Sequence, residues 1–171
     1  SLVEHQHGGR FWQEVRWNWP ARVVPFLVGG VVLSITLQAF AHFLPMPKEL
    51  PIDEFFRTPR EAWMLSLFGM TVAPLMEELF FRGFLYPVLA RRMGIAPAIF
   101  VTALSFALIH APQLGRAWGP ILIVFLVGVA LTATRAFTRS VGASILVHMA
   151  YNFTLFLQFY IGTHGFRNLQ G

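Results

Sequence analysis

Residues 61–93 read EAWMLSLFGMTVAPLMEELFFRGFLYPVLARRM, and this stretch decides the fold. Between the charges at its two ends, its only charged residues are Glu77, Glu78 and Arg82. One helix of this length is about 50 Å long, which exceeds the thickness of a bilayer. We therefore predict a membrane-spanning helix that tilts, kinks near Pro74 or projects beyond the lipid.

Similar apolar runs lie on both sides of this stretch. The run 23–44 contains no Asp, Glu, Lys or Arg, and about 20 apolar residues suffice to cross the hydrocarbon. Three further runs follow, at residues 95–110, 118–137 and 141–161. The sequence therefore predicts an all-α fold, a polytopic membrane helical bundle of about five transmembrane helices, with residues 21–171 forming a single domain.

The composition is typical of a chain embedded in lipid. Only 12% of the 171 residues are charged, 56% are hydrophobic, and the mean hydropathy is +0.59. Soluble domains typically carry about 25% charged residues, so this chain lacks the charge to cover a water-facing surface. The net charge of +5 is scattered without a dense basic run, which indicates contact with lipid headgroups and no nucleic-acid partner. The absence of cysteine excludes disulfides and thiolate metal sites.

Residues 1–20 are polar and aromatic, with Trp12, Trp17 and Trp19 interleaved with arginines. Tryptophan and arginine are typical of segments at the membrane surface, so we predict an interfacial N-terminal segment. The segment has no apolar core, and we do not expect a signal peptide there. With five crossings, the distribution of Lys and Arg between the loops favours an N-terminus on the inside.

The charged residues inside the second span need a chemical explanation. A charge near the bilayer centre costs about 2.5–3.5 kcal/mol on insertion scales, so such residues require partners. Glu78 and Arg82 are four residues apart and share a helix face, so they are expected to pair. Glu77 points about 100° away from Glu78 and has no partner on its own helix. We interpret Glu77 as a functional residue.

Further polar residues lie on two other apolar spans. His110 ends the third span, and His148 and Asn152 share one face of the fifth span because they are four residues apart. Buried polar groups in lipid need one another, which predicts a shared polar cavity between the second, third and fifth spans. At 1.5 Å per residue, His110 lies about 24 Å along its span and His148 about 12 Å along its own, so their meeting requires staggered or tilted helices.

Two kinds of chemistry fit this set of side chains. A carboxylate beside an imidazole can hold and deprotonate water, while a second imidazole and an amide can stabilise an oxyanion. Together these steps would hydrolyse an amide bond. Two imidazoles and a carboxylate are also a zinc ligand set with room for a water, although the signature H-E-x-x-H is absent. These residues alone leave both alternatives open.

The three motifs that carry these residues resemble those of the CPBP family. This family groups CAAX prenyl endopeptidases with bacteriocin-processing and immunity-type membrane proteins of bacteria. Its motifs are E-E-x-x-x-R, F-x-x-x-H and H-x-x-x-N, in that order. They occur here as Glu77-Glu78 with Arg82, Phe106 with His110, and His148 with Asn152. The sequence around them is similar to the bacterial branch, which implies a bacterial plasma membrane protein.

The resemblance implies an intramembrane endopeptidase that hydrolyses a peptide bond of a membrane-associated protein or peptide. It implies that Glu77 is the general base, that His110 helps it to activate water, and that His148 and Asn152 stabilise the oxyanion. Glu78 and Arg82 would hold the site together. We favour a mechanism without a cofactor. If zinc takes part, Glu77, His110 and His148 are the expected ligands. The substrate and the oligomeric state do not follow from the sequence.

Two other functions compete with the peptidase. A membrane protein of the same family could bind a partner without cleaving it, as an immunity or scaffold protein. A small transporter could use the polar cavity as a substrate path. The intact set of three motifs favours the enzyme, and the halves of the chain show none of the repeat symmetry that is typical of transporters.

Overall fold

The computed structural model describes residues 17–169, and every regular element in that range is helical. The prediction of an all-α bundle is therefore confirmed. The helices are α2 (Val24–Ala41), α3 (Pro59–Met70), α4 (Val72–Glu78), α5 (Tyr86–Met93), α6 (Ile95–His110), α7 (Trp118–Thr138) and α8 (Val141–Gly162). A 3₁₀ turn, η1 (Pro51–Phe55), precedes α3, and a π-helical segment, η2 (Leu79–Leu85), joins α4 to α5.

Four helical stretches in this part of the chain are long and apolar enough to cross a membrane. They are Val24–Ala41, Pro59–Met93, Trp118–Thr138 and Val141–Gly162. The helix α6 is shorter, at 16 residues, but equally apolar. These five stretches lie within a few residues of the predicted ones, and their length and composition are those of an integral membrane protein.

The second predicted span is not one regular helix. Thr71 leaves the helical conformation, with φ −124° and ψ −72°, and separates α3 from α4. Pro74 follows three residues later and lacks the N–H that would continue the helical hydrogen bonds to Met70. The Thr71 N–H donates to the Phe68 carbonyl at 3.2 Å, and the Thr71 hydroxyl donates to the Leu67 carbonyl at 2.6 Å. A break near Pro74 therefore accommodates the length of this stretch.

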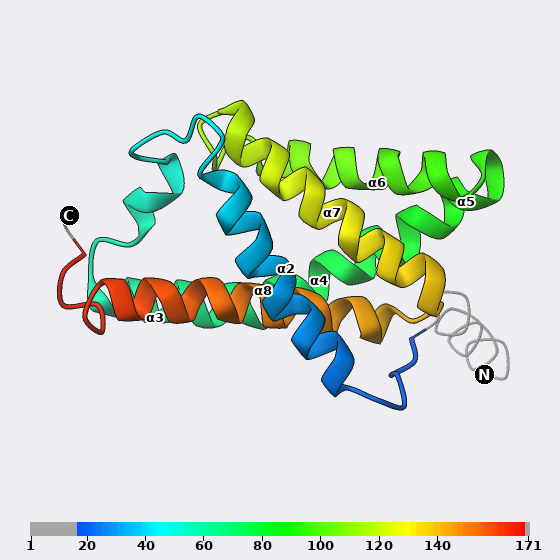
Figure 1. Cartoon of the computed structure of the whole chain (residues 1–171), viewed down its shortest axis with the longest axis horizontal. Coiled ribbons are helices and arrows are strands. Elements are labelled where there is room, and N and C mark those ends of the chain that lie inside the picture. Colours follow the sequence, from blue (N-terminus) through cyan, green and yellow to red (C-terminus); the bar gives the residue numbers. More distant parts are fainter. Residues whose placement is uncertain (1–16, 170–171) are drawn as a thin grey trace, which may run out of the picture.

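Neighbouring helices approach each other closely at two glycines. Figure 1 shows α3 and α8 along one edge of the molecule, with α2 crossing α8, α6 along the opposite edge and α7 running diagonally from the side of α6 to the start of α8. A Cβ on Gly30 of α2 would collide with the Val147 carbonyl oxygen of α8. A Cβ on Gly128 of α7 would come within 3.0 Å of the Ala103 backbone on α6. These glycines let the helix backbones approach closely, as is typical of packing in membranes.

The ends of α8 are held by segments outside the bundle. Ser140 Oγ, at its N-terminal cap, donates to the Asn18 carbonyl at 2.6 Å. Residues 1–16, most of the segment predicted to lie at the membrane surface, fall outside the described residues. At the other end, the buried ring of Phe166 packs against four aromatic rings. These belong to Trp63, Phe156, Phe159 and Tyr160.

Candidate active site

Glu78 and Arg82 form a fully buried ion pair at the centre of the bundle. Arg82 Nη1 donates to Glu78 Oε1 at 2.8 Å, and both side chains have no exposed surface. Glu78 is the last residue of α4, and Arg82 lies one turn later in the π-helical segment. A buried pair of this kind is costly unless its remaining groups are hydrogen-bonded. The other hydrogen bonds of Arg82 and Glu78 therefore determine whether the buried pair is stable.

The rest of the guanidinium is held by helix α7 and by an aromatic ring. Arg82 Nε donates to Thr132 Oγ1 at 3.2 Å, and Nη2 donates to the Gly128 carbonyl at 3.1 Å. The guanidinium carbon also lies 4.6 Å from the ring centroid of Phe106. Each of the three guanidinium nitrogens thus has a directed partner, which fixes the orientation of this planar group.

Glu78 Oε1 also contacts His148, on helix α8. His148 Nδ1 lies 2.9 Å from this oxygen, and both groups are buried. Because the carboxylate is paired with Arg82 and accepts hydrogen bonds, Nδ1 is the donor. The contact directs the other nitrogen of the ring, Nε2, toward Glu77. A carboxylate that holds one imidazole nitrogen in this way sets the orientation of the ring.

His110 is oriented by the residue one helical turn before it. Its Nδ1 lies 2.7 Å from the carbonyl oxygen of Phe106, and the two rings are 4.6 Å apart. A carbonyl can only accept, so Nδ1 carries the hydrogen and Nε2 of the neutral ring is an acceptor. Phe106 therefore has two roles at the site. Its carbonyl orients His110, and its ring packs against the guanidinium of Arg82.

Glu77 lies between the two imidazoles. Its Oε1 is 3.6 Å from His110 Nε2, and its Oε2 is 3.8 Å from His148 Nε2. About a quarter of its side chain is exposed (24%), whereas Glu78 is fully buried. The two adjacent carboxylates thus have different surroundings: Glu78 is held among fixed partners, and Glu77 is partly exposed beside His110 and the buried ring of His148. Glu77, His110 and His148, which the sequence predicted to share one site, therefore lie close together.

Asn152 follows His148 by one turn of α8 and makes a contact of its own. Its Nδ2 donates to the Gly69 carbonyl at 2.7 Å, near the end of α3. Asn152 thereby links α8 to the break at Thr71. One N–H of the amide is used in this way, and the group has a second N–H. Its predicted role at an oxyanion stays a prediction.

Comparison with known proteins identifies the family. A family model described as type II CAAX prenyl endopeptidase Rce1-like matches residues 59–154, which is more than half of the chain. The chain belongs to this family. Searches of curated proteins and of solved structures found no match to this chain.

The part matched by the CAAX endopeptidase family contains all six predicted site residues. It begins at α3 and ends within α8, and so includes Glu77, Glu78, Arg82, His110, His148 and Asn152. Helix α2 lies outside it and packs on α8. The resemblance noted in the three motifs is therefore confirmed at the level of the family, which is one of membrane endopeptidases.

No group of three or more His, Cys, Asp or Glu residues within residues 17–169 is arranged to hold a metal ion. Glu77, His110 and His148 are the three that the sequence suggested as zinc ligands. Their nearest atoms, the Glu77 oxygens and the two Nε2 atoms, are 3.6 and 3.8 Å apart.

Several contacts at the site were not foreseen from the sequence. The pairing of Glu78 with His148 and the contribution of α7 through Thr132 and Gly128 join residues that are far apart in the chain. Neither Thr132 nor Gly128 belongs to one of the three motifs. Their only sequence signal is that they are small or hydroxylated residues in an apolar span, which is typical of helix packing in general.

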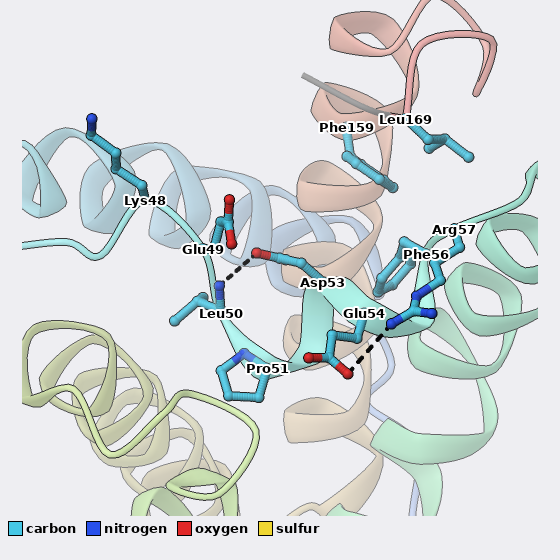
Figure 2. Close-up of a pocket in the computed structure, with 10 residues that line it drawn as sticks. All are labelled: Lys48, Glu49, Leu50, Pro51, Asp53, Glu54, Phe56, Arg57, Phe159 and Leu169. Carbon is cyan, nitrogen blue, oxygen red and sulfur yellow. Dashed lines mark hydrogen bonds and ion pairs between the residues drawn. The ribbon is translucent and has the colours of Figure 1, made fainter.

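A surface pocket lies away from these residues, at the end of the bundle. Figure 2 shows this pocket of about 720 Å³ between residues 48–57 and the C-terminal part of α8. Three of its charged residues make local contacts: Asp53 accepts from the Leu50 N–H at 2.7 Å, and Glu54 pairs with Arg57 at 3.6 Å. Both side chains of that pair are mostly exposed, and ion pairs of this kind contribute little to stability.

Proposed function

We propose that this chain is an intramembrane endopeptidase that cleaves a peptide bond of a membrane-associated protein or peptide with water activated by Glu77 and His110. The observation that carries the proposal is the position of the Glu77 carboxylate, 3.6 and 3.8 Å from the Nε2 atoms of His110 and His148. These groups come from three separate helices. The membership of the chain in a CAAX endopeptidase family supports the same reaction.

Glu77 and His110 are suited to hold the attacking water. Their separation of 3.6 Å exceeds a direct hydrogen bond, and a water can hydrogen-bond to both from beside the line that joins them. One hydrogen of this water would point to Glu77 Oε1 and the other to His110 Nε2, the acceptor nitrogen. A lone pair of the oxygen then faces the substrate. Glu77 acts as the general base because a carboxylate can take up the proton completely.

His148 is suited to stabilise the oxyanion because the hydrogen bond from its Nδ1 to Glu78 fixes the orientation of the ring. With Nδ1 donating to Glu78, His148 can donate from Nε2 only as an imidazolium. The proposal therefore requires His148 to be cationic when it donates from Nε2 to the oxyanion. The second N–H of Asn152, one turn away, would donate to the same oxyanion.

The reaction balances as an ordinary hydrolysis. The water oxygen bonds to the carbonyl carbon, its proton moves to Glu77, and the carbonyl oxygen becomes an oxyanion that accepts from His148 and Asn152. When the oxyanion collapses, the carbon–nitrogen bond breaks and the proton on Glu77 moves to the leaving nitrogen. The products are a new carboxylic acid and a new amine, and Glu77 returns to its starting state. No cofactor is required by these steps.

The experiment is cleavage of quenched fluorescent peptides by the purified chain in liposomes. One probe ends in a farnesylated cysteine followed by three residues, and a second has the same sequence without the lipid. Wild-type protein is expected to cleave at least one of them, and in H₂¹⁸O the new carboxylate should carry one ¹⁸O. Glu77→Gln should lower kcat by about 100-fold or more.

Glu49→Gln is the matched control because Glu49 is an exposed carboxylate outside the site. It should cleave at the wild-type rate. Wild-type cleavage rates in Glu77→Gln would contradict the role of Glu77. A folded wild-type protein that cleaves neither probe but binds one of them would favour a non-proteolytic partner-binding function.

A further inference from the structure

We propose that Thr132, on helix α7, is a positioning residue for this site: its hydroxyl orients Arg82 so that Glu78 can hold His148. The catalytic consequence rests on the proposed peptidase function. The chain of contacts that carries the inference contains Thr132, Arg82, Glu78 and His148. All four residues are buried, and Thr132, Arg82 and Glu78 have no exposed surface.

The first link is the contact between Thr132 and Arg82. Thr132 Oγ1 accepts from Arg82 Nε at 3.2 Å and donates to the Gly128 carbonyl at 2.7 Å. The same carbonyl accepts from Arg82 Nη2 at 3.1 Å. Thr132 and Gly128 therefore provide two acceptors for one edge of the guanidinium. The Thr132 hydroxyl is a side-chain group, whereas the Gly128 carbonyl belongs to the backbone. Because Arg donors have a fixed planar geometry, holding this edge sets the direction of Nη1 on the other side.

The second link runs from Arg82 to the imidazole. Nη1 donates to Glu78 Oε1 at 2.8 Å, and the same oxygen receives Nδ1 of His148 at 2.9 Å. One carboxylate oxygen is thus shared by the two donors, while Glu78 Oε2 has no hydrogen-bond partner among residues 17–169. A shared oxygen is sensitive to the direction from which each donor arrives. If Arg82 rotates, Glu78 can turn Oε2 toward it and weaken the hold on His148.

Other threonines on α7 show what is particular to Thr132. Thr134 and Thr138 also donate from their hydroxyls to the carbonyl four residues earlier, at 2.9 and 2.7 Å. This bond within the helix is a common local feature of threonine. Thr132 makes the same bond but also accepts from Arg82 across a separation of 50 residues. Thr138 Oγ1 also accepts a second hydrogen bond, but from the Ser140 N–H two residues later in the chain, at 3.3 Å.

The experiment compares Thr132→Val, Thr132→Ser and Thr134→Val in the chain reconstituted in liposomes. Valine keeps the shape of threonine and removes the hydroxyl, whereas serine keeps the hydroxyl. Thr132→Val should lower kcat about tenfold or more with little change in KM, an effect typical of partners that orient a reacting group. Thr132→Ser should restore most of the rate, and Thr134→Val should match wild type. If Thr132→Val does not fold, Thr132→Ala compared with Thr132→Ser makes the same test.

A second measurement does not require activity. Protein labelled with ¹⁵N-histidine, with the His148 signals assigned by their loss in His148→Gln, reports on the hydrogen at Nδ1. In wild type this hydrogen should exchange slowly with water because it is held by Glu78. Exchange should become at least several-fold faster in Thr132→Val, with no change in Thr132→Ser or Thr134→Val.

The two measurements separate the possible failures. If wild type cleaves no peptide but His148 responds as expected, the peptidase function fails and the positioning role of Thr132 stands. If wild type cleaves and Thr132→Val matches it in kcat and in the His148 signal, the positioning role is wrong and the peptidase function stands. Equal losses in Thr132→Val and Thr132→Ser would also overturn the proposal, since the hydroxyl would then not be the cause.

Discussion

His148 Nδ1 and Glu78 Oε1 lie 2.9 Å apart although 70 residues separate them in the chain. The contact joins the first and the third sequence motif and gives the second glutamate of the pair a function of its own. Glu78 receives Arg82 and His148 at one oxygen, whereas Glu77 faces the Nε2 atoms of both imidazoles. Adjacent carboxylates on one helix thus point to different partners, and we infer that one supports the site while the other reacts.

Glu78→Gln should lower both stability and activity. The substitution leaves the Arg82 charge buried without a counter-charge, and breaking one side of a buried ion pair typically costs about 3–5 kcal/mol. It also replaces the carboxylate that holds His148 Nδ1 with a neutral amide. We expect a lower midpoint of thermal unfolding in detergent and a kcat reduced about 100-fold at temperatures where the protein is folded.

The double variant Glu78→Gln with Arg82→Met separates these two effects. Methionine removes the uncompensated charge, so the unfolding midpoint should recover toward the wild-type value. Activity should stay low because His148 still lacks its charged partner. Full recovery of activity in the double variant would show that Glu78 contributes only through stability.

Much of the fold follows from the sequence because lipid imposes a simple rule. A backbone in hydrocarbon must satisfy its own hydrogen bonds, so long apolar runs become helices and their ends are set by charges, prolines and glycines. The run 95–110, for example, became α6 at Ile95–His110. The ion pair between Glu78 and Arg82 was equally predictable, since residues four apart share a helix face.

Contacts between helices were less predictable, because spacing along a chain does not fix how two helices align. Counting residues placed His110 and His148 at different depths, yet both Nε2 atoms lie within 4 Å of one carboxylate. The helices α6 and α8 must therefore be offset or tilted relative to each other. The same limit explains why Thr132, and the contact of Asn152 with Gly69, could not be foreseen.

Gly30→Ala should destabilise the bundle. A methyl group at Gly30 would collide with the Val147 carbonyl and the Ala150 side chain, so α2 must move away from α8. Overpacking of this kind typically costs about 1–3 kcal/mol. The unfolding midpoint, measured by circular dichroism during heating in detergent, should fall.

Gly29→Ala is the matched control, because a Cβ at this neighbouring position meets nothing within 4 Å. Alanine is favoured over glycine in a helix by about 0.5–1 kcal/mol, so this variant should be as stable as wild type or slightly more stable. Equal destabilisation by both substitutions would contradict the close approach of α2 and α8.

Phe166→Ala should loosen the junction between α3 and the end of α8. The ring is 1% exposed and lies 5.3 Å from the rings of Trp63 and Tyr160, measured between centroids. Replacing a buried phenylalanine by alanine typically costs about 3–5 kcal/mol. Phe153, whose surface is 50% exposed, provides the control, and Phe153→Ala should change the unfolding midpoint much less. Similar midpoints for both variants would show that the Phe166 ring does not stabilise this end of the molecule.

Chelators should leave cleavage unchanged if the mechanism uses no metal. The proposed reaction generates its nucleophile with Glu77 and His110, so neither EDTA nor 1,10-phenanthroline should slow wild-type protein. The measurement is the cleavage rate after incubation with each chelator, with a zinc peptidase as the positive control. Loss of activity that zinc alone restores would overturn this prediction and would assign Glu77, His110 and His148 as ligands instead.

Asn152→Asp should separate the structural and catalytic uses of the amide. Aspartate has nearly the same shape but no N–H, so it cannot donate to the Gly69 carbonyl or to an oxyanion. Loss of an oxyanion donor typically lowers kcat by about 100- to 1,000-fold, whereas loss of the Gly69 contact alone affects stability. Thr154→Val is the control on the same helix, because Thr154 donates only to the Ala150 carbonyl at 2.8 Å. We expect Asn152→Asp to reduce kcat by at least 100-fold with KM nearly unchanged, and Thr154→Val to retain wild-type kinetics. A variant that unfolds at lower temperature but keeps its kcat would restrict Asn152 to joining α8 and α3.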